Sequence, residues 1–443
     1  MARAPPGGKG NAPGQCAWVP KRLRFGVPET SADPYASLRL PNFRLFIIGL
    51  FAFTMAIQIQ GTVVGWQIYE LTHDKLALGL IGLAEAVPFI GAALYAGHVA
   101  DRHDRRRVVL AALALLFACA VALLVLPMLL PAAPGLIVRA IYGVVALSGL
   151  SRSFLNPARQ ALAAELIPRS LYGNAITWRS GIWQLASVIG PAVGGVLYAA
   201  GGTTLTYAVD AGLMLVGGGA MVLIAHRSLI KREHTEAIAK SLATGIRFVF
   251  NEPIILGALT LDLFSVLFGG ATALLPVYAA EILHVGPSGL GLLRAAPAIG
   301  AVAMSAAIAW MPPFRRTGRT LFLAVATFGL CIVIFGFSTS MILSVAALVL
   351  SGVADMVSVF IRSSLIQHRT PTHMLGRVSS VNSIFVGSSN EIGAFESGVT
   401  AKLFGTVPSV VLGGVATLVV VAVTAWRLPA LRKLGRMETT TVS

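Results

Sequence analysis

The chain has 443 residues, of which 56% are hydrophobic and 12% are charged, and its formal net charge is +16 at pH 7. Soluble domains carry about 25% charged residues, so this composition and the mean hydropathy of +0.79 exclude an ordinary soluble domain and indicate a membrane protein. In a soluble protein such a positive balance would suggest nucleic acid. Here the basic residues are confined to particular loops, so we expect no nucleic-acid partner.

The chain begins with a polar segment rich in proline and glycine that has no apolar core of a cleavable signal peptide. We expect residues 1–40 to form a disordered cytoplasmic tail. Cys16 lies in this tail, while Cys119 and Cys331 lie in apolar stretches far from it and from each other. This spacing supports neither a disulfide framework nor a metal site, so we expect no metal and no cofactor.

After the tail, apolar stretches near the roughly 20 residues that cross a membrane recur along the chain. They are predicted to be helices, because lipid offers no partners for backbone polar groups and the stretches lack the alternation of barrel strands. The fold class is therefore an all-α membrane protein with about twelve transmembrane helices. The predicted spans are 45–68, 77–99, 108–130, 135–156, 175–199, 204–226, 254–278, 288–311, 319–338, 341–363, 380–403 and 407–428.

Arginine and lysine gather in alternate loops. The basic segments are the N-terminal tail and the loops 102–107, 159–169, 227–247, 315–319, 369–377 and 427–436, whereas the other loops hold only Lys75 and Lys402. By the positive-inside rule both termini and the basic loops are cytoplasmic.

The central loop, residues 227–253, separates an N-terminal six-helix bundle (41–226) from a C-terminal one (254–428), which a cytoplasmic tail (429–443) follows. The spacing of Leu242, Ile246, Val249 and Phe250 suits either an amphipathic helix on the inner membrane surface or a plain linker. Five residues recur at equal separations in the two halves and suggest a duplication, as in transporters whose site lies between two bundles. They are Arg159, Pro168, Gly173, Gly190 and Gly195, matched by Arg362, Pro371, Gly376, Gly393 and Gly398.

The stretch GHVADRHDRRR, residues 97–107, follows the second predicted span. Gly97 allows two helices to approach closely, and Asp101 can face the positive end of a neighbouring helix or an arginine. We expect a cytoplasmic latch that holds the halves together in one state and breaks in the other. Its residues are Gly97, Asp101, Arg102, Arg105 and Arg106. Alternatively, the arginines only anchor the loop to anionic lipid.

Residues 97–107 resemble the loop motif of the major facilitator superfamily, although Asp104 stands where that family more widely has glycine. Arg139-Ala-Ile-Tyr-Gly143 resembles the family's Arg-x-x-x-Gly motif associated with proton coupling. Gly190-Pro191-Ala-Val-Gly194-Gly195 resembles the end of its antiporter motif, without the upstream glycines expected at Thr177 and Ala186. The resemblance is to the bacterial branch of small-molecule exporters related to the enterobactin and macrolide exporters. It implies two pseudo-symmetric bundles in the bacterial inner membrane.

The same glycines have a physical reading. Gly190, Gly194 and Gly195 permit tight helix crossing, and Pro191 frees a backbone carbonyl and favours a bend, although simple helix packing explains them equally well.

Ionisable residues within the spans are candidate functional residues, because they are costly in hydrocarbon. We expect two ion pairs within the bundles, Glu85 with Arg139 and Arg294 with Glu396. Asp262, on the seventh span, is the first candidate to exchange a proton. The other candidates are Asp355, Glu391 and Glu396.

Polar and aromatic residues of the first span add to this set. Gln58 and Gln60 are candidates to contact a substrate, and Trp66 joins them or belongs to the interfacial aromatic belt. Asp210 is expected to pack beside a hydroxyl partner such as Thr206.

These features favour a secondary active exporter, in the main a proton antiporter for a drug, a siderophore or another amphiphilic metabolite. We expect a monomer whose partners are the substrate, protons and the lipid bilayer. The alternatives are a facilitator or importer of the same fold and a polytopic membrane enzyme. An enzyme is poorly supported, since the sequence shows no metal-spaced cluster, nucleophile elbow or P-loop lysine.

Overall fold

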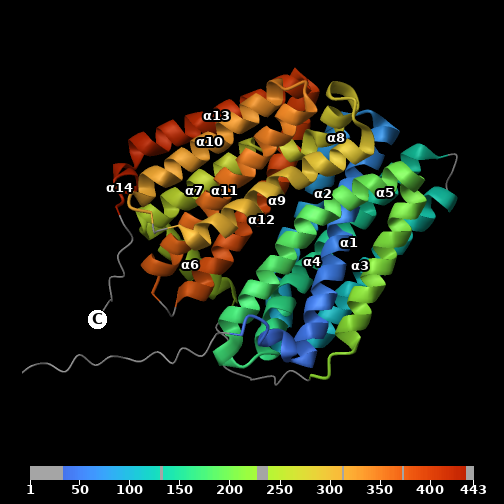
Figure 1. The fold of residues 1–443 in the computed structure, drawn as a ribbon, viewed down its shortest axis with the longest axis horizontal. Coiled ribbons are helices and arrows are strands. Elements are labelled where there is room, and N and C mark those ends of the chain that lie inside the picture. The colour runs from blue at the N-terminus through green and yellow to red at the C-terminus, as the bar shows by residue number, and fades with distance from the viewer. Residues whose placement is uncertain (1–32, 130–132, 227–237, 312–313, 372–373, 436–443) are drawn as a thin grey trace, which may run out of the picture.

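The protein is described here by a computed structural model that covers residues 33–129, 133–226, 238–311, 314–371 and 374–435 (Figure 1). These residues form helices and connecting turns and contain no strand. Most of the predicted N-terminal tail, with Cys16, and the last residues of the C-terminal tail lie outside them. The long helices are α1 (Pro41–Thr72), α2 (Lys75–Arg102), α3 (Arg105–Leu129), α4 (Pro134–Glu165), α5 (Tyr172–Val222), α6 (Ile238–Asn251), α7 (Pro253–Phe268), α9 (Gly286–Trp310), α10 (Thr317–Phe337), α11 (Met341–Arg369), α12 (Leu375–Phe404) and α13 (Thr406–Arg427). The short ones are η1 (Ser37–Arg39), η2 (Arg169–Leu171), η3 (Ala271–Leu274), α8 (Leu275–Val277), η4 (Tyr278–Ile282) and α14 (Pro429–Arg432).

The helices account for the twelve predicted spans. Within the described residues, ten helical stretches are long and apolar enough to cross a membrane. One of them contains α5, which is two spans joined at the non-helical residues Gly201 and Gly202. The twelfth is α12, a helix of 30 residues whose serines and glutamates keep it outside that set. The expected all-α fold with twelve membrane helices is therefore confirmed.

Several helices continue beyond the predicted spans. Helix α4 ends at Glu165 instead of near residue 156, and α11 ends at Arg369 instead of near residue 363. Hydropathy marks only the apolar part of a helix, whereas polar residues continue it past the hydrocarbon. Arg159, which we expected in a loop, consequently lies inside α4.

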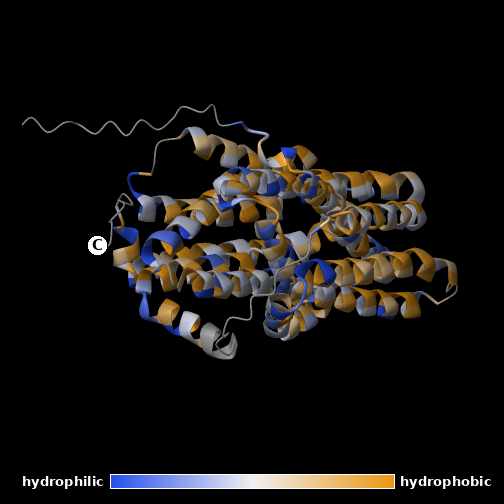
Figure 2. Ribbon diagram, turned by 90° about the horizontal axis from the view of Figure 1, so that it is seen from below, coloured by the Kyte–Doolittle hydropathy of each residue, from blue (hydrophilic) through white to orange (hydrophobic). Residues whose placement is uncertain are grey.

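The helices form two bundles, α1 to α5 and α7 to α13 (Figure 1). Each bundle has its own buried apolar clusters, such as the one around Phe46, Leu113 and Leu162 in the first and the one around Leu261 and Ile361 in the second. Apolar residues run along both bundles (Figure 2). The loop between the bundles contains α6, and its Gly245 lies against the backbone of Arg377 in α12. That α6 lies on the membrane surface stays a prediction.

The halves touch mainly through α2 with α12 and α5 with α9. These contacts are backbone to backbone: a Cβ added to Gly398 would lie 2.6 Å from the Cα of Gly79, and one added to Gly195 would lie 2.4 Å from the carbonyl oxygen of Pro287. We call this the joined end. It carries the turns between α1 and α2 and between α12 and α13.

At the opposite end the bundles diverge (Figure 1). Cβ atoms added to Gly97 of α2, Gly173 of α5 or Gly376 of α12 would have no atom from elsewhere in the described structure within 4 Å. We call this the open end. One end of the structure is therefore closed and the other is open. This is one of the two conformations, here called facings, that a transporter of two bundles is expected to adopt.

Candidate functional site

Two polar contacts tie the halves together at the joined end. The Tyr69 hydroxyl of α1 donates a hydrogen bond to Glu281 of η4. The Lys402 Nζ lies 3.1 Å from the Asp74 carboxylate, joining the C-terminal part of α12 to the N-cap of α2. Both contacts must break before this end can separate.

Deeper in the molecule, charged residues gather where the halves meet. In the N-terminal half Glu85 of α2 forms an ion pair with Arg152 of α4. From the C-terminal half, Glu391 of α12 lies within electrostatic range of both Arg152 and Arg294 of α9. We call Glu85, Arg152, Arg294 and Glu391 the central charge cluster.

Helix packing holds this cluster in place. The Glu391 backbone carbonyl would lie 2.8 Å from a Cβ added to Gly82, so α12 presses directly on α2 at this residue. Arg294 reaches across the interface and donates a hydrogen bond of 2.5 Å to the Gly61 carbonyl of α1. Two charged groups of the second half therefore contact the first half.

The expected ion pairs are wrong in their partners. Glu85 pairs with Arg152 rather than Arg139, which is exposed and donates a hydrogen bond to the Gly135 carbonyl of its own helix. Arg294 has Glu391, not Glu396, as its acidic neighbour. The sequence gives the depth of a residue along its helix but does not determine the direction its side chain takes around it.

A second ion pair is buried inside the C-terminal half. The carboxylate of Asp262 on α7 pairs with the guanidinium of Arg362 on α11, and both side chains are less than a tenth exposed. Asp355, one of the candidate proton sites, lines a small cavity together with Asp262, Ser265 and Ser358. The structure thus brings Asp262 and Asp355 together.

Asp210 was expected beside Thr206, and this partner is wrong. The Thr206 hydroxyl donates a hydrogen bond to the Gly202 carbonyl. Asp210 is fully buried, and neither of its carboxylate oxygens has a hydrogen-bond partner among the described residues.

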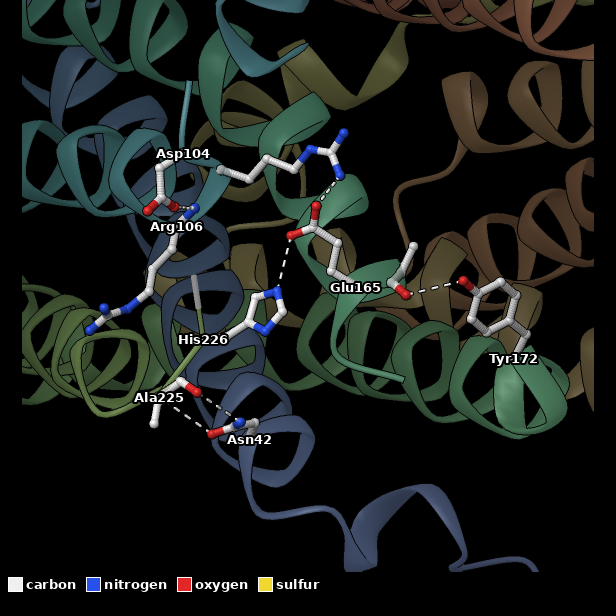
Figure 3. A network of polar contacts seen from close by, with 9 residues as sticks. Asn42, Asp104, Arg106, Glu165, Tyr172, Ala225 and His226 are labelled. Atoms are coloured by element: carbon white, nitrogen blue, oxygen red, sulfur yellow. Dashed lines mark hydrogen bonds and ion pairs between the residues drawn. The ribbon is translucent and has the colours of Figure 1, made fainter. Parts of the chain in front are cut away.

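At the open end, the arginines of the predicted latch contact their own half. Arg105 pairs with Glu165 at the end of α4, and His226 Nε2 lies 3.2 Å from the same carboxylate (Figure 3). Arg106 donates hydrogen bonds to the Met221 and Val222 carbonyls at the end of α5.

The remaining latch residues are Gly97, Asp101 and Arg102. Arg102 is exposed and Gly97 meets open space, while the side chain of Asp101 lies outside the described part of the structure.

The glycines of α5 serve close helix approach. A Cβ on Gly190 would lie 2.5 Å from the Cβ of Gln58, and one on Gly194 would lie 3.2 Å from the Cα of Ile59, so both glycines face α1. Gly195 instead faces α9 of the other half, and a Cβ on Gly291 would lie 2.6 Å from the Pro191 carbonyl.

The structure does not gather the polar residues of the first span into one site. Gln58 packs closely against Gly190 of α5, and Gln60 is buried. The indole nitrogen of Trp66 is buried without a hydrogen-bond partner among the described residues.

Sequence reasoning missed Arg152, the residue that links the two carboxylates of the central charge cluster. Two signals point to it. It lies seven residues before Arg159 and therefore on the same helical face. It also matches Asp355 at the separation that relates Arg159 to Arg362 in the internal repeat.

A transporter built from two helical bundles, with charged residues at their interface, is the class that these features define. The profile of the Major Facilitator Superfamily matches residues 46–394, and the chain belongs to this family of transporters.

The chain is similar to curated members of the family. It is 29% identical to the enterobactin exporter EntS of Citrobacter koseri over 395 residues, covering 86% of this chain and 90% of the relative. It is 28% identical to the enterobactin exporter EntS of Shigella flexneri over 394 residues, with the same coverage.

Among solved structures, the fold is similar to that of a peptide transporter POT, with a TM-score of 0.71 and 14% identity, covering 89% of this chain and 95% of that one. It is also similar to the nucleoside transporter NupG, with a TM-score of 0.68 and 11% identity, covering 87% of this chain and 99% of that one. At these identities the likeness concerns the fold.

Proposed function

We propose that the protein exports a small organic molecule from the bacterial cytoplasm in exchange for protons. The observation that carries this proposal is the position of Glu391, a carboxylate of one half that attracts Arg152 of the other half and Arg294 at their interface. A proton on Glu391 removes that attraction. The free-energy difference between the two facings then depends on proton occupancy, which is what coupling requires.

The proposed direction of transport rests on the similar proteins and on the distribution of basic residues. The curated relatives are named as exporters. The basic loops lie at the open end, and Lys75 and Lys402 are at the joined end, so by the positive-inside rule the open end faces the cytoplasm. Both termini are then cytoplasmic, and a molecule enters from inside the cell.

The coupling is tested in inverted membrane vesicles that contain the protein, with radiolabelled enterobactin and a radiolabelled macrolide as probes. We expect an imposed acidic interior to drive accumulation of a probe, and Glu391→Gln to abolish the dependence on the gradient. Arg169→Gln, which removes an exposed charge just before α5, is the control and keeps the dependence. Equal accumulation with and without the gradient would show facilitated diffusion and contradict the proposal.

The orientation has its own test. Single cysteines at Lys75 and Arg169, in a background with Cys16, Cys119 and Cys331 replaced, are labelled in intact cells with a membrane-impermeant maleimide. Labelling at Lys75 only is expected, and labelling at Arg169 only would invert the topology.

A further inference from the structure

Two arginines of the N-terminal half lie near each other without an acidic partner. Arg159 of α4 and Arg179 of α5 are close enough to repel one another. The Arg159 guanidinium carbon lies 5.7 Å from the ring centroid of Phe53 on α1. Across the described residues, no carboxylate forms an ion pair with either arginine.

The two arginines lie at the same depth from the open end. Arg159 is six residues before the end of α4 and Arg179 is seven residues after the start of α5. At a rise of about 1.5 Å per residue, both are roughly 10 Å from their helix ends. Both side chains are partly exposed.

Helical geometry points Arg159 toward the interface between the halves. It lies two turns from Arg152, on the same face of α4, and Arg152 is attracted to Glu391 of the other half. Arg159 and Arg179 therefore precede the central charge cluster on the way in from the open end.

The C-terminal half treats the corresponding positions differently. Arg362, the repeat counterpart of Arg159, is neutralised by Asp262 of α7, the first helix of its half. On α1, the first helix of the other half, the aromatic ring of Phe53 lies beneath Arg159. By the same separation Arg179 corresponds to the uncharged Asn382. Only the N-terminal half thus presents two uncompensated guanidinium groups here.

A charged group that is partly withdrawn from water is costly unless it is paired, so two guanidinium groups without an acidic partner favour a site that an anion completes. Guanidinium groups bind carboxylate and phosphate oxygens through paired, charge-assisted hydrogen bonds. Arg159 also lies beside the aromatic ring of Phe53, which belongs to a buried apolar cluster. A ligand that fits this pair of arginines has an anionic group attached to an apolar body.

We propose that Arg159 and Arg179 form a subsite for the anionic group of the transported molecule, which is an organic anion such as an aromatic carboxylate, phosphate or sulfonate. This inference rests on the proposed function, since it names the substrate class of that transport path. In this proposal the N-terminal half binds the anionic group of the substrate. The carboxylates of α11 and α12, in the C-terminal half, bind the proton.

Binding is measured on the purified full chain in nanodiscs of zwitterionic lipid, by the shift of its melting temperature. The probes are a panel of aromatic carboxylates, phosphates and sulfonates, each paired with its neutral ester or amide. We expect stabilisation to be concentrated among the anions. Arg179→Gln should raise the Kd of a stabilising anion about tenfold, because one charge-assisted contact is lost. Arg179→Lys should retain part of the affinity.

Arg169→Gln is the matched control, because it removes one exposed charge near the start of α5 and should leave the Kd unchanged. The inference is overturned if no anion stabilises the protein, if neutral members do so equally, or if Arg179→Gln binds anions like the native chain. It is also overturned if phosphatidylglycerol added to the nanodiscs stabilises the protein while soluble anions do not, since the pair is then a lipid site.

The outcome is separable from that of the proposed function. Anion binding without gradient-dependent flux in vesicles would leave the subsite standing and remove proton exchange. Gradient-dependent flux of a neutral or cationic probe that Arg179→Gln does not change would support proton exchange and overturn the anionic subsite.

Discussion

Arg152 and Arg362 show two ways in which a charge is held within the membrane helices. Arg362 is buried with Asp262 in one half, where both side chains are less than a tenth exposed. Arg152 is more exposed, at 28%, and lies between Glu85 of its own half and Glu391 of the other. Both partners of the first pair belong to the same half, so we expect its loss to affect stability. The second can change partners when the halves move.

The Glu85 and Arg152 pair predicts a charge-swap result. Glu85→Gln should lower the transport rate at least tenfold, because Arg152 loses its partner within the N-terminal half. Exchanging the charges, with Glu85→Arg and Arg152→Glu together, should recover part of the rate in the vesicle assay. A swap between Glu85 and Arg139 should recover nothing, and recovery there would contradict the pairing.

The Asp262 and Arg362 pair predicts a stability effect. Breaking a buried ion pair from one side costs about 3–5 kcal/mol, whereas replacing both partners by apolar residues is often nearly neutral. Asp262→Leu should therefore lower the melting temperature of the purified protein much more than Asp262→Leu with Arg362→Met. If the double variant melts no higher than the single one, the pair is not the source of the effect.

At the level of helices, small residues bring α2 to α12 and α5 to α9 at the joined end. No side chain larger than hydrogen fits at Gly195 without a shift of α9. This contact exists only while the joined end is closed. A larger side chain at Gly195 should therefore destabilise that facing and leave the opposite one unaffected.

Gly195→Val should weaken closure of the joined end and shift the protein toward the opposite facing. Spin labels at the ends of α1 and α9 nearest the joined end should report longer distances, and transport should fall. Gly181→Val is the matched control on the same helix, because a Cβ there meets no neighbouring atom within 4 Å. Equal effects of the two variants would mean that the loss comes from the helix itself rather than from the contact.

The helices were largely predictable from sequence, because a hydrocarbon layer demands long apolar stretches with internally paired backbones. The polar helix ends were not predictable, since Arg159, Gln160 and Glu165 interrupt the apolar pattern of α4 near its end. The partner of Glu85 was unpredictable for another reason. When a helix is apolar on several faces, its sequence does not show how the helix is rotated about its axis. The choice between Arg139 and Arg152 therefore depends on helix packing, which one sequence does not reveal.

Across the whole molecule, the two ends differ in the contacts that must be lost when the protein changes from one facing to the other. The joined end closes through Tyr69 with Glu281, Asp74 with Lys402 and the glycine contacts. The open end keeps its latch arginines on their own half, where Glu165 and the end of α5 hold them. In the latch hypothesis, Asp101 and its neighbours contact the second half when the protein adopts the opposite facing.

The latch hypothesis predicts the effect of Asp101→Asn. The substitution removes the charge that can face a helix end or an arginine of the other half, so it should favour the facing seen here and slow transport several-fold. Cysteine accessibility at Gly376 measures the balance, with Arg169→Gln as a control for the loss of a charge outside the latch. An unchanged balance and rate would leave the arginine run only as an anchor to lipid.

Cross-linking tests whether the two ends alternate. In a background with Cys16, Cys119 and Cys331 replaced, Asp74→Cys with Lys402→Cys should be joined rapidly by a short bis-methanethiosulfonate, which forms a disulfide with each thiol, since their native side chains lie 3.1 Å apart. Transport should stop and return on reduction, because the joined end can no longer separate. Gly97→Cys with Gly376→Cys at the open end should react slowly without substrate and faster when export is driven. If the joined end is cross-linked and flux continues, substrate does not pass by alternate opening of the two ends, and the facing seen here is not a step of the cycle.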